Sequence, residues 1–99
     1  MPHIKVALCE DNEVFRESLV QFIDDTPGFK VVGSLASADA IIEAIEAFQP
    51  DVVLMDIDMP GMNGIKATGL IKSHHPSVHV LILTVYDDDQ KIFDAILAG

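Results

Sequence analysis

The fold is decided by the stretch Val52-Val53-Leu54-Met55-Asp56, in which four uninterrupted apolar residues lead directly into an acid. Such a run is typical of a central parallel strand that is covered on both faces. The segment that follows, residues 59–64 (Met-Pro-Gly-Met-Asn-Gly), has the composition of a turn. We therefore expect the carboxylate of Asp56 at the carboxyl end of an inner strand, and we interpret it as the chemical centre of the protein.

Outside this strand, strand-like and helix-like segments alternate. Three further strands are predicted at residues 4–9, 29–33 and 78–83. The predicted helices begin after the capping residues Asn12 and Ser37, at residue 65, and at the acidic run of residues 87–89. The apolar face of the first helix is formed by Phe15, Leu19, Phe22 and Ile23. This order predicts an α/β fold, a doubly wound parallel sheet with helices on both faces.

Composition limits the function further. The chain has 99 residues, which predicts a single domain, residues 1–99. Its net charge of −10 argues against direct binding to nucleic acid or to an anionic membrane, because both require a surplus of Lys and Arg. We expect no signal peptide, and the one cysteine excludes an internal disulfide framework. We expect a cytoplasmic protein.

Acidic residues gather at the predicted strand ends. Glu10 and Asp11 follow the first strand, and Asp58 lies two residues after Asp56. Open parallel sheets bind ligands at the carboxyl ends of their strands, so adjacent first and third strands would place the carboxylates of Glu10, Asp11 and Asp56 in one crevice. Their repulsion is relieved by a raised pKa or by a cation, and Mg²⁺ suits an all-oxygen site of this kind. A carboxylate beside Mg²⁺ can attack phosphorus, and the Thr84 hydroxyl can donate to a phosphoryl oxygen.

Together, these motifs resemble the receiver domain of bacterial two-component response regulators. The resemblance rests on Glu10-Asp11, the strand ending at Asp56, the turn at residues 59–64 and Leu83-Thr84. It covers nearly the whole chain, and it implies a flavodoxin-like fold in a signalling protein that is not an enzyme beyond self-phosphorylation and slow dephosphorylation.

The resemblance also implies roles for individual residues. Asp56 would be the phosphoacceptor, and Thr84 would be the switch hydroxyl that moves toward the phosphoryl group. Glu10, Asp11 and Asp56 would hold Mg²⁺ together with the backbone carbonyl of Asp58. A sensor histidine kinase or a small acyl phosphate would donate the phosphoryl group. The stretch of residues 84–89 is similar to regulators whose output is a helix-turn-helix DNA-binding domain.

The sequence departs from the family pattern at its end. Receiver domains have a fifth strand and a fifth helix, and a lysine at the end of that strand pairs with the phosphoryl group. The chain ends at Gly99, and none of its six Lys and Arg residues directly follows a predicted strand. We therefore expect an incomplete receiver domain that binds Mg²⁺ weakly and is phosphorylated poorly. An uncovered edge strand and an exposed apolar helix face also predict self-association, for example as a homodimer.

Other protein classes share parts of this pattern. Asp56-Ile57-Asp58 matches the Asp-x-Asp motif of haloacid-dehalogenase-like phosphatases, but that family carries the motif on its opening strand. A flavodoxin-type carrier needs a phosphate loop rich in Ser, Thr and Gly after the first strand, where this chain has acids. A receiver-like interaction module that works without phosphorylation is the remaining alternative.

Overall fold

The computed structural model describes residues 3–57, 59 and 61–83. Strands and helices alternate in this region, as predicted. The elements in chain order are β1 (Ile4–Cys9), α1 (Glu13–Asp24), β2 (Phe29–Leu35), α2 (Ile41–Phe48), β3 (Val52–Asp56), α3 (Gly64–His74) and β4 (His79–Leu83). The predicted last helix lies outside the described residues. None of the described helices is long and apolar enough to cross a membrane.

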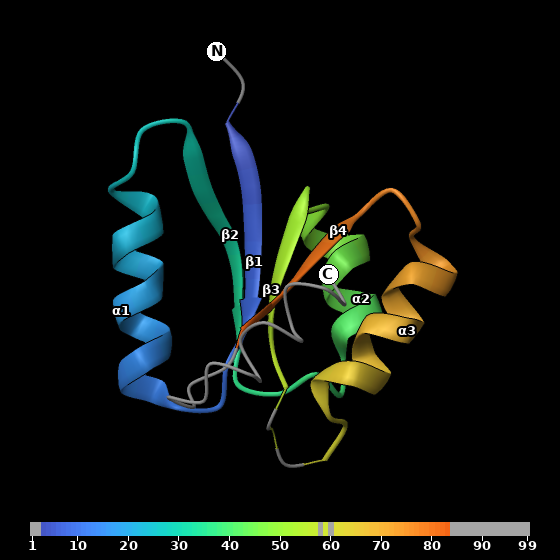
Figure 1. The fold of residues 1–99 in the computed structure, drawn as a ribbon. Helices are drawn as coiled ribbons and strands as arrows, with labels where there is room; N and C mark the ends of the chain where they lie inside the picture. Colours follow the sequence, from blue (N-terminus) through green and yellow to red (C-terminus); the bar gives the residue numbers. More distant parts are fainter. Residues whose placement is uncertain (1–2, 58, 60, 84–99) are drawn as a thin grey trace.

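The four strands form one parallel sheet in the order β2-β1-β3-β4. The helix α1 covers one face of the sheet, and α2 and α3 cover the other (Figure 1). The fold is therefore the doubly wound α/β sheet that the sequence predicts. The chain leaves β1 toward β2 and returns to β3 on the other side of β1, so the order of strands reverses between β1 and β3. Polar residues at the carboxyl ends of these two strands share the crevice where such sheets bind ligands.

The most completely buried part of the molecule lies between the sheet and the pair α2 and α3. Val53 and Met55 of β3 are fully buried, and so is Ile71 of α3. The strand β3 shows no alternation of apolar and polar residues before its final acid, which agrees with an inner parallel strand. The sequence pattern of β3 therefore identified the centre of the sheet correctly.

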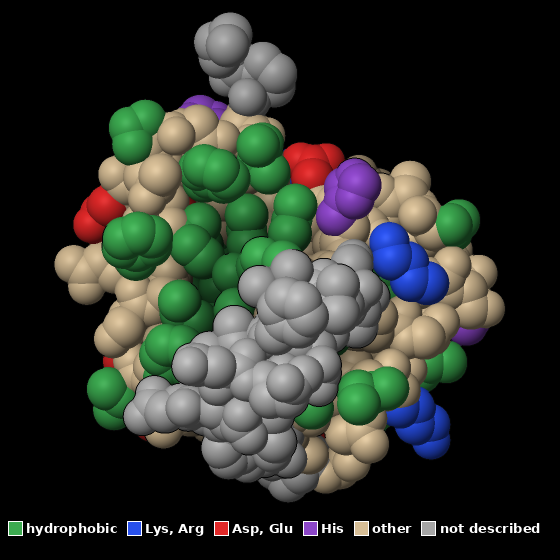
Figure 2. Space-filling model, in the orientation of Figure 1, with side chains coloured by type: hydrophobic (Ala, Val, Ile, Leu, Met, Phe, Trp, Pro, Cys, Tyr) green, Lys and Arg blue, Asp and Glu red, His purple; other side chains and the backbone are tan. Residues whose placement is uncertain are grey.

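The opposite face, beside α1, is packed more openly. No residue of α1 is fully buried, and the side chain of Phe22 is 72% exposed, although the helical pattern placed it on the buried face. An apolar groove of about 340 Å³ separates α1 from the sheet and is lined by Phe22, Ile23, Phe29, Leu54 and Leu81, among others. Hydrophobic side chains gather along this face (Figure 2). The predicted amphipathic stripe is thus present, but the described residues cover it only in part.

Of the two residues predicted to cap helices, one does so in the structure. The Asn12 side chain accepts a hydrogen bond from the amide of Phe15 at 2.9 Å and so caps α1, as predicted. The prediction that Ser37 caps α2 is wrong, because α2 begins later, after Ala40, and has no side-chain cap. The Ser37 hydroxyl instead faces the amide of Asp39 at 3.5 Å, within the preceding loop.

Candidate functional site

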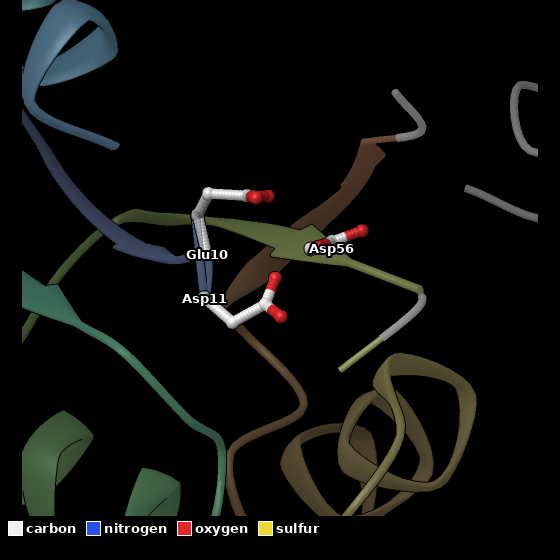
Figure 3. Close-up of side chains that lie close together, drawn as sticks. All are labelled: Glu10, Asp11 and Asp56. Atoms are coloured by element: carbon white, nitrogen blue, oxygen red, sulfur yellow. The ribbon is translucent and has the colours of Figure 1, made fainter. Parts of the chain in front are cut away.

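Three carboxylates meet at the carboxyl ends of β1 and β3. They belong to Glu10, Asp11 and Asp56, and one oxygen of each lies within 4.8 Å of the others. Glu10 and Asp11 come from the end of β1, and Asp56 comes from the end of β3 (Figure 3). The three residues predicted to share a crevice are therefore brought together, because β1 and β3 are direct neighbours with Cys9 paired to Met55.

The three acids differ in their exposure to solvent. Glu10 is 1% exposed and Asp56 is 2% exposed, whereas the side chain of Asp11 is open to solvent. The sequence pattern predicted the position of these acids but not that two of them are almost completely buried. A buried carboxylate is costly to ionise unless it is hydrogen-bonded, paired or bound to a metal.

Several hydrogen bonds hold Glu10 in place. Its amide donates to the carbonyl oxygen of Leu35 at 3.0 Å, which extends the sheet beyond the last residue of β1. The amide of Asn12 donates to Glu10 Oε1 at 3.2 Å. The Arg16 guanidinium donates from Nη1 to the carbonyl oxygen of Glu10 at 2.8 Å. The turn between β1 and α1 is thus fixed by both its backbone and its side chains.

Burial and crowding change the acidity of Glu10. Loss of solvent is the main cause that raises its pKa from 4.5 to about 7, and a hydrogen bond shared with the Asp56 carboxyl acts in the same direction. The negative charges of Asp56 and Asp11 also raise this pKa, while the bond from the Asn12 amide lowers it. At neutral pH the site is therefore stabilised either by a proton on a carboxyl group or by a cation that takes the place of this proton.

The arrangement fits a hard divalent cation. All three groups offer carboxylate oxygens, which Mg²⁺ prefers, and the exposed Asp11 leaves a side open for the waters that Mg²⁺ retains. The buried Glu10 Oε2 has no hydrogen-bond donor among the described residues when the carboxyls are ionised. A cation at this point would supply the missing partner. Glu10, Asp11 and Asp56 are accordingly the described residues that could hold it.

Arg16 belongs to this site and was missed by the sequence prediction. No Lys or Arg directly follows a strand predicted from the sequence, so the sequence pattern indicated no cation near the acids. Arg16 instead reaches the turn from the first turn of α1, four residues after the cap Asn12. Its spacing from the cap Asn12 could have indicated this contact. Helical side chains point back toward the helix N-terminus, so a long side chain one turn after the cap reaches the preceding turn.

The loop after Asp56 is tied to its surroundings from two directions. The amide of Gly64 donates to the carbonyl oxygen of Ile57 at 3.1 Å, at the start of α3. The amide of Met62 donates to Asp39 Oδ1 at 3.3 Å, from the loop before α2. Gly61 has a φ of +79°, a conformation that favours glycine, which explains this residue in the predicted turn. Two further predicted site residues, Asp58 and Thr84, lie outside the described residues.

The sequence model of a known family, the response regulator receiver domain, matches residues 6–99. The chain belongs to this family. The acids at the ends of β1 and β3 therefore lie in a receiver domain of a two-component response regulator, a signalling module. This membership confirms the family that the sequence motifs resemble, and it argues against the phosphatase and the flavodoxin-type carrier as alternatives.

Individual relatives support the same family. The chain is 38% identical over 96 residues to the DNA-binding transcriptional activator DevR/DosR of Mycobacterium tuberculosis, covering 97% of this chain and 44% of that protein. It is 40% identical over 87 residues to protein-glutamate methylesterase/protein-glutamine glutaminase 2 of Paramagnetospirillum magneticum, covering 88% of this chain and 25% of that protein. The receiver domain thus spans less than half the length of these curated relatives.

A solved receiver domain has the same fold. The signal receiver domain of the response regulator NarL from Mycobacterium tuberculosis superposes with a TM-score of 0.84 at 29% sequence identity. The match covers 100% of this chain and 80% of that domain. The doubly wound sheet of Figure 1 is therefore the receiver fold.

Proposed function

We propose that this receiver domain accepts a phosphoryl group on the carboxylate of Asp56. The observation that carries the proposal is the buried pair of Glu10 and Asp56, which meets the exposed Asp11 at the switch point of the sheet. Of the three acids, Asp56 is the one that is itself the last residue of a strand, β3, and it lies beside the start of α3. This position supports a role as the nucleophile, in a site where a cation held by the three acids would balance negative charge.

The transfer consists of one bond made and one bond broken. An oxygen of Asp56 attacks phosphorus, the bond from phosphorus to the donor's imidazole nitrogen breaks, and the imidazole leaves with the electron pair. The product is an acyl phosphate on Asp56. Mg²⁺, held by Glu10, Asp11 and Asp56, would offset the charge that develops on the phosphoryl oxygens. The carbonyl of Asp58 and the hydroxyl of Thr84 remain predicted contributors to this site.

We infer that the donor is the phosphohistidine of a sensor kinase. Support comes from apolar residues on the two helices that begin beside the site. Val14, in the first turn of α1, is 76% exposed, and Ile65, in the first turn of α3, is 68% exposed. Exposed apolar side chains that flank an acidic crevice suit a protein donor, which must bury surface while it presents its phosphoryl group.

We further infer that the whole protein regulates transcription, with the phosphoryl group acting as a switch and not as a product to be released. The support is the similarity to a DNA-binding transcriptional activator over 97% of this chain. Turnover by the domain itself would then be limited to acceptance of the group and its slow hydrolysis.

Intact-mass measurement tests the phosphoacceptor directly. The chain is incubated with Mg²⁺ and either acetyl phosphate or a phosphorylated histidine kinase domain. We expect partial labelling, in which the labelled fraction carries a single phosphoryl group that hydroxylamine removes, as an acyl phosphate requires. Asp56→Asn should abolish the addition. Asp25→Asn, which changes an exposed acid at the other end of α1, should leave it unchanged.

Two results would count against the proposal. Equal labelling of Asp56→Asn and the parent chain would place the acceptor elsewhere. A folded parent chain that binds Mg²⁺ but takes no label from either donor would instead favour an interaction module that works without phosphorylation.

A further inference from the structure

Arg16 is a half-buried cation whose side chain turns back from α1 toward the acidic group. Its Nη1 donates to the carbonyl oxygen of Glu10 at 2.8 Å, and Glu10 supplies one of the three clustered carboxylates. We propose that Arg16 is a positioning residue: its guanidinium clamps the turn between β1 and α1 and so holds Glu10 and Asp11 in the geometry that binds a divalent cation. The inference rests on the proposed function, because it concerns the same cation site.

Helix geometry explains why residue 16 can make this contact. The amide of Arg16 donates to the carbonyl oxygen of Asn12 at 2.8 Å, so Arg16 lies one helical turn beyond the cap. Side chains on a helix tilt toward its N-terminus, and a long side chain at this position therefore extends back over the preceding turn. The planar guanidinium has five N–H donors in fixed directions, which lets it bond a carbonyl while the rest of the group remains partly solvated.

The bonded carbonyl belongs to the peptide that joins Glu10 to Asp11. Rotation of this peptide would change the direction of both side chains relative to Asp56. The amide of Glu10 is already bonded to Leu35, on the β2 side, and its carbonyl is the group that Arg16 holds. The clamp thus fixes the one peptide plane on which two of the three carboxylates depend.

A positive charge beside three acids would also act through its electric field. The two effects can be separated, because salt screens the field of a partly exposed charge over about 8 Å at physiological ionic strength. A hydrogen bond that fixes a peptide plane is far less sensitive to salt. In metal sites, partners that orient the ligands typically change metal affinity by about 10- to 100-fold when removed.

Mg²⁺ titration by calorimetry, at low and at high salt, provides the test. Arg16→Ala should weaken Mg²⁺ binding by about 10-fold or more at both salt concentrations. Arg16→Lys, which keeps a donor and the charge, should recover part of the affinity, and Lys30→Ala, which removes an exposed charge on β2, should have no effect. The ¹³C resonance of the Glu10 carbonyl should also shift when Arg16 is replaced by alanine, because the carbonyl loses its donor.

Each alternative outcome has a defined meaning. Equal Mg²⁺ affinity in Arg16→Ala and the parent chain overturns the role of Arg16 and leaves the phosphoacceptor site intact. The field of the Arg16 charge by itself opposes the binding of a cation, so a gain in Mg²⁺ affinity that shrinks at high salt would show a field effect and would also overturn the positioning role. If the parent chain itself binds no Mg²⁺, the proposed site fails and the clamp fails with it.

A second variant keeps the test decisive if Arg16→Ala does not fold. Arg16→Gln then replaces it, because glutamine is a shorter, neutral side chain that suits the same helix. We expect a shifted Glu10 carbonyl resonance together with weaker Mg²⁺ binding. Full Mg²⁺ affinity in spite of a shifted carbonyl resonance would overturn the clamp, since the site would then bind the cation without the hydrogen bond.

Discussion

Gly64, the first residue of α3, lies directly against the backbone carbonyl of Asp56. A Cβ atom placed on Gly64 would overlap this carbonyl oxygen and would approach the Ile57 Cα to 2.9 Å. Both neighbours are backbone atoms, so no side chain can rotate to make room. The absence of a side chain at residue 64 therefore allows α3 to begin next to the proposed phosphoacceptor.

Gly64→Ala should consequently force α3 away from the end of β3. We expect a loss of about 1–3 kcal/mol in the free energy of unfolding, as for other overpacked sites, and a lower rate of phosphoryl acceptance because Asp56 moves with its backbone. Urea denaturation and the mass-based labelling assay measure the two effects.

Gly69→Ala is the matched control on the same helix. Apart from its chain neighbours and the backbone of its own helix, no described atom lies within 4 Å of a Cβ placed on Gly69, so the change should stabilise the chain by about 0.5–1 kcal/mol through helix propensity alone. It should leave labelling unchanged. Similar behaviour of the two alanine variants would contradict the close packing of Gly64 against Asp56.

The buried carboxyl of Glu10 predicts an unusual dependence of stability on pH. In the unfolded chain this group loses its proton near pH 4.5, whereas in the folded chain its pKa is raised to about 7. Between these values Glu10 binds more protons in the folded state than in the unfolded state, so its contribution to the free energy of unfolding falls as pH rises. The raised pKa stabilises the folded state by roughly 3 kcal/mol in acid, and this contribution is lost once the pH exceeds the pKa of Glu10 in the folded chain.

Glu10→Gln mimics the protonated carboxyl and should remove this contribution. Without divalent ions, we expect the variant to be more stable than the parent chain by about 1–3 kcal/mol at alkaline pH and nearly equal to it in acid. Added Mg²⁺ should stabilise the parent but not the variant. Urea denaturation across pH measures this difference, with Glu13→Gln on the exposed first turn of α1 as the control. A parent chain as stable as Glu10→Gln at alkaline pH would contradict the burial of Glu10.

The position of the candidate site could be predicted because it depends on two strong sequence signals. The uninterrupted apolar run before Asp56 identifies an inner strand, and parallel topology then brings the end of β1 beside it. The sequence also predicted that crowded acids would show a raised pKa or bind a cation, and the pKa of Glu10 is raised. Which acid is affected could not be predicted, since the burial of Glu10 depends on neighbouring elements that are distant in sequence. Only the folded arrangement shows which of two adjacent acids is buried.

Three other differences between prediction and structure also have physical causes. Ser37 has a favoured capping side chain, but the chain needs further residues to cross from β2 to the other face before α2 can begin. Phe22 satisfies the helical period of α1, yet periodicity assigns a face without showing how completely the face is covered. Arg16 lies outside every motif, and its contact with Glu10 follows from side-chain direction in a helix, not from spacing along a strand.

Cys9 should be protected from alkylation in the folded chain. Its thiol is fully buried at the end of β1, and burial raises its pKa to about 12, so very little thiolate forms at neutral pH. It is the only cysteine, and labelling by iodoacetamide therefore reports one site. We expect slow modification in native buffer and rapid modification in urea, followed by mass spectrometry. Native labelling as fast as that of the unfolded chain would show that the end of β1 is open.

The two faces of the sheet are packed unequally, so mutations on them should lower the free energy of unfolding by different amounts. Ile71 of α3 is fully buried in the core, whereas Phe22 of α1, although larger, is 72% exposed. Ile71→Ala should cost about 2–5 kcal/mol and Ile71→Val about 0.5–1.5 kcal/mol, because each leaves a cavity. Phe22→Ala should change stability by only about 0.5 kcal/mol, as expected for a surface position. Urea midpoints of the three variants test this order, with Ile71→Val available if Ile71→Ala does not fold. A larger loss at Phe22 than at Ile71→Val would mean that the α1 face is covered in solution and contributes to stability as much as the α2 and α3 face.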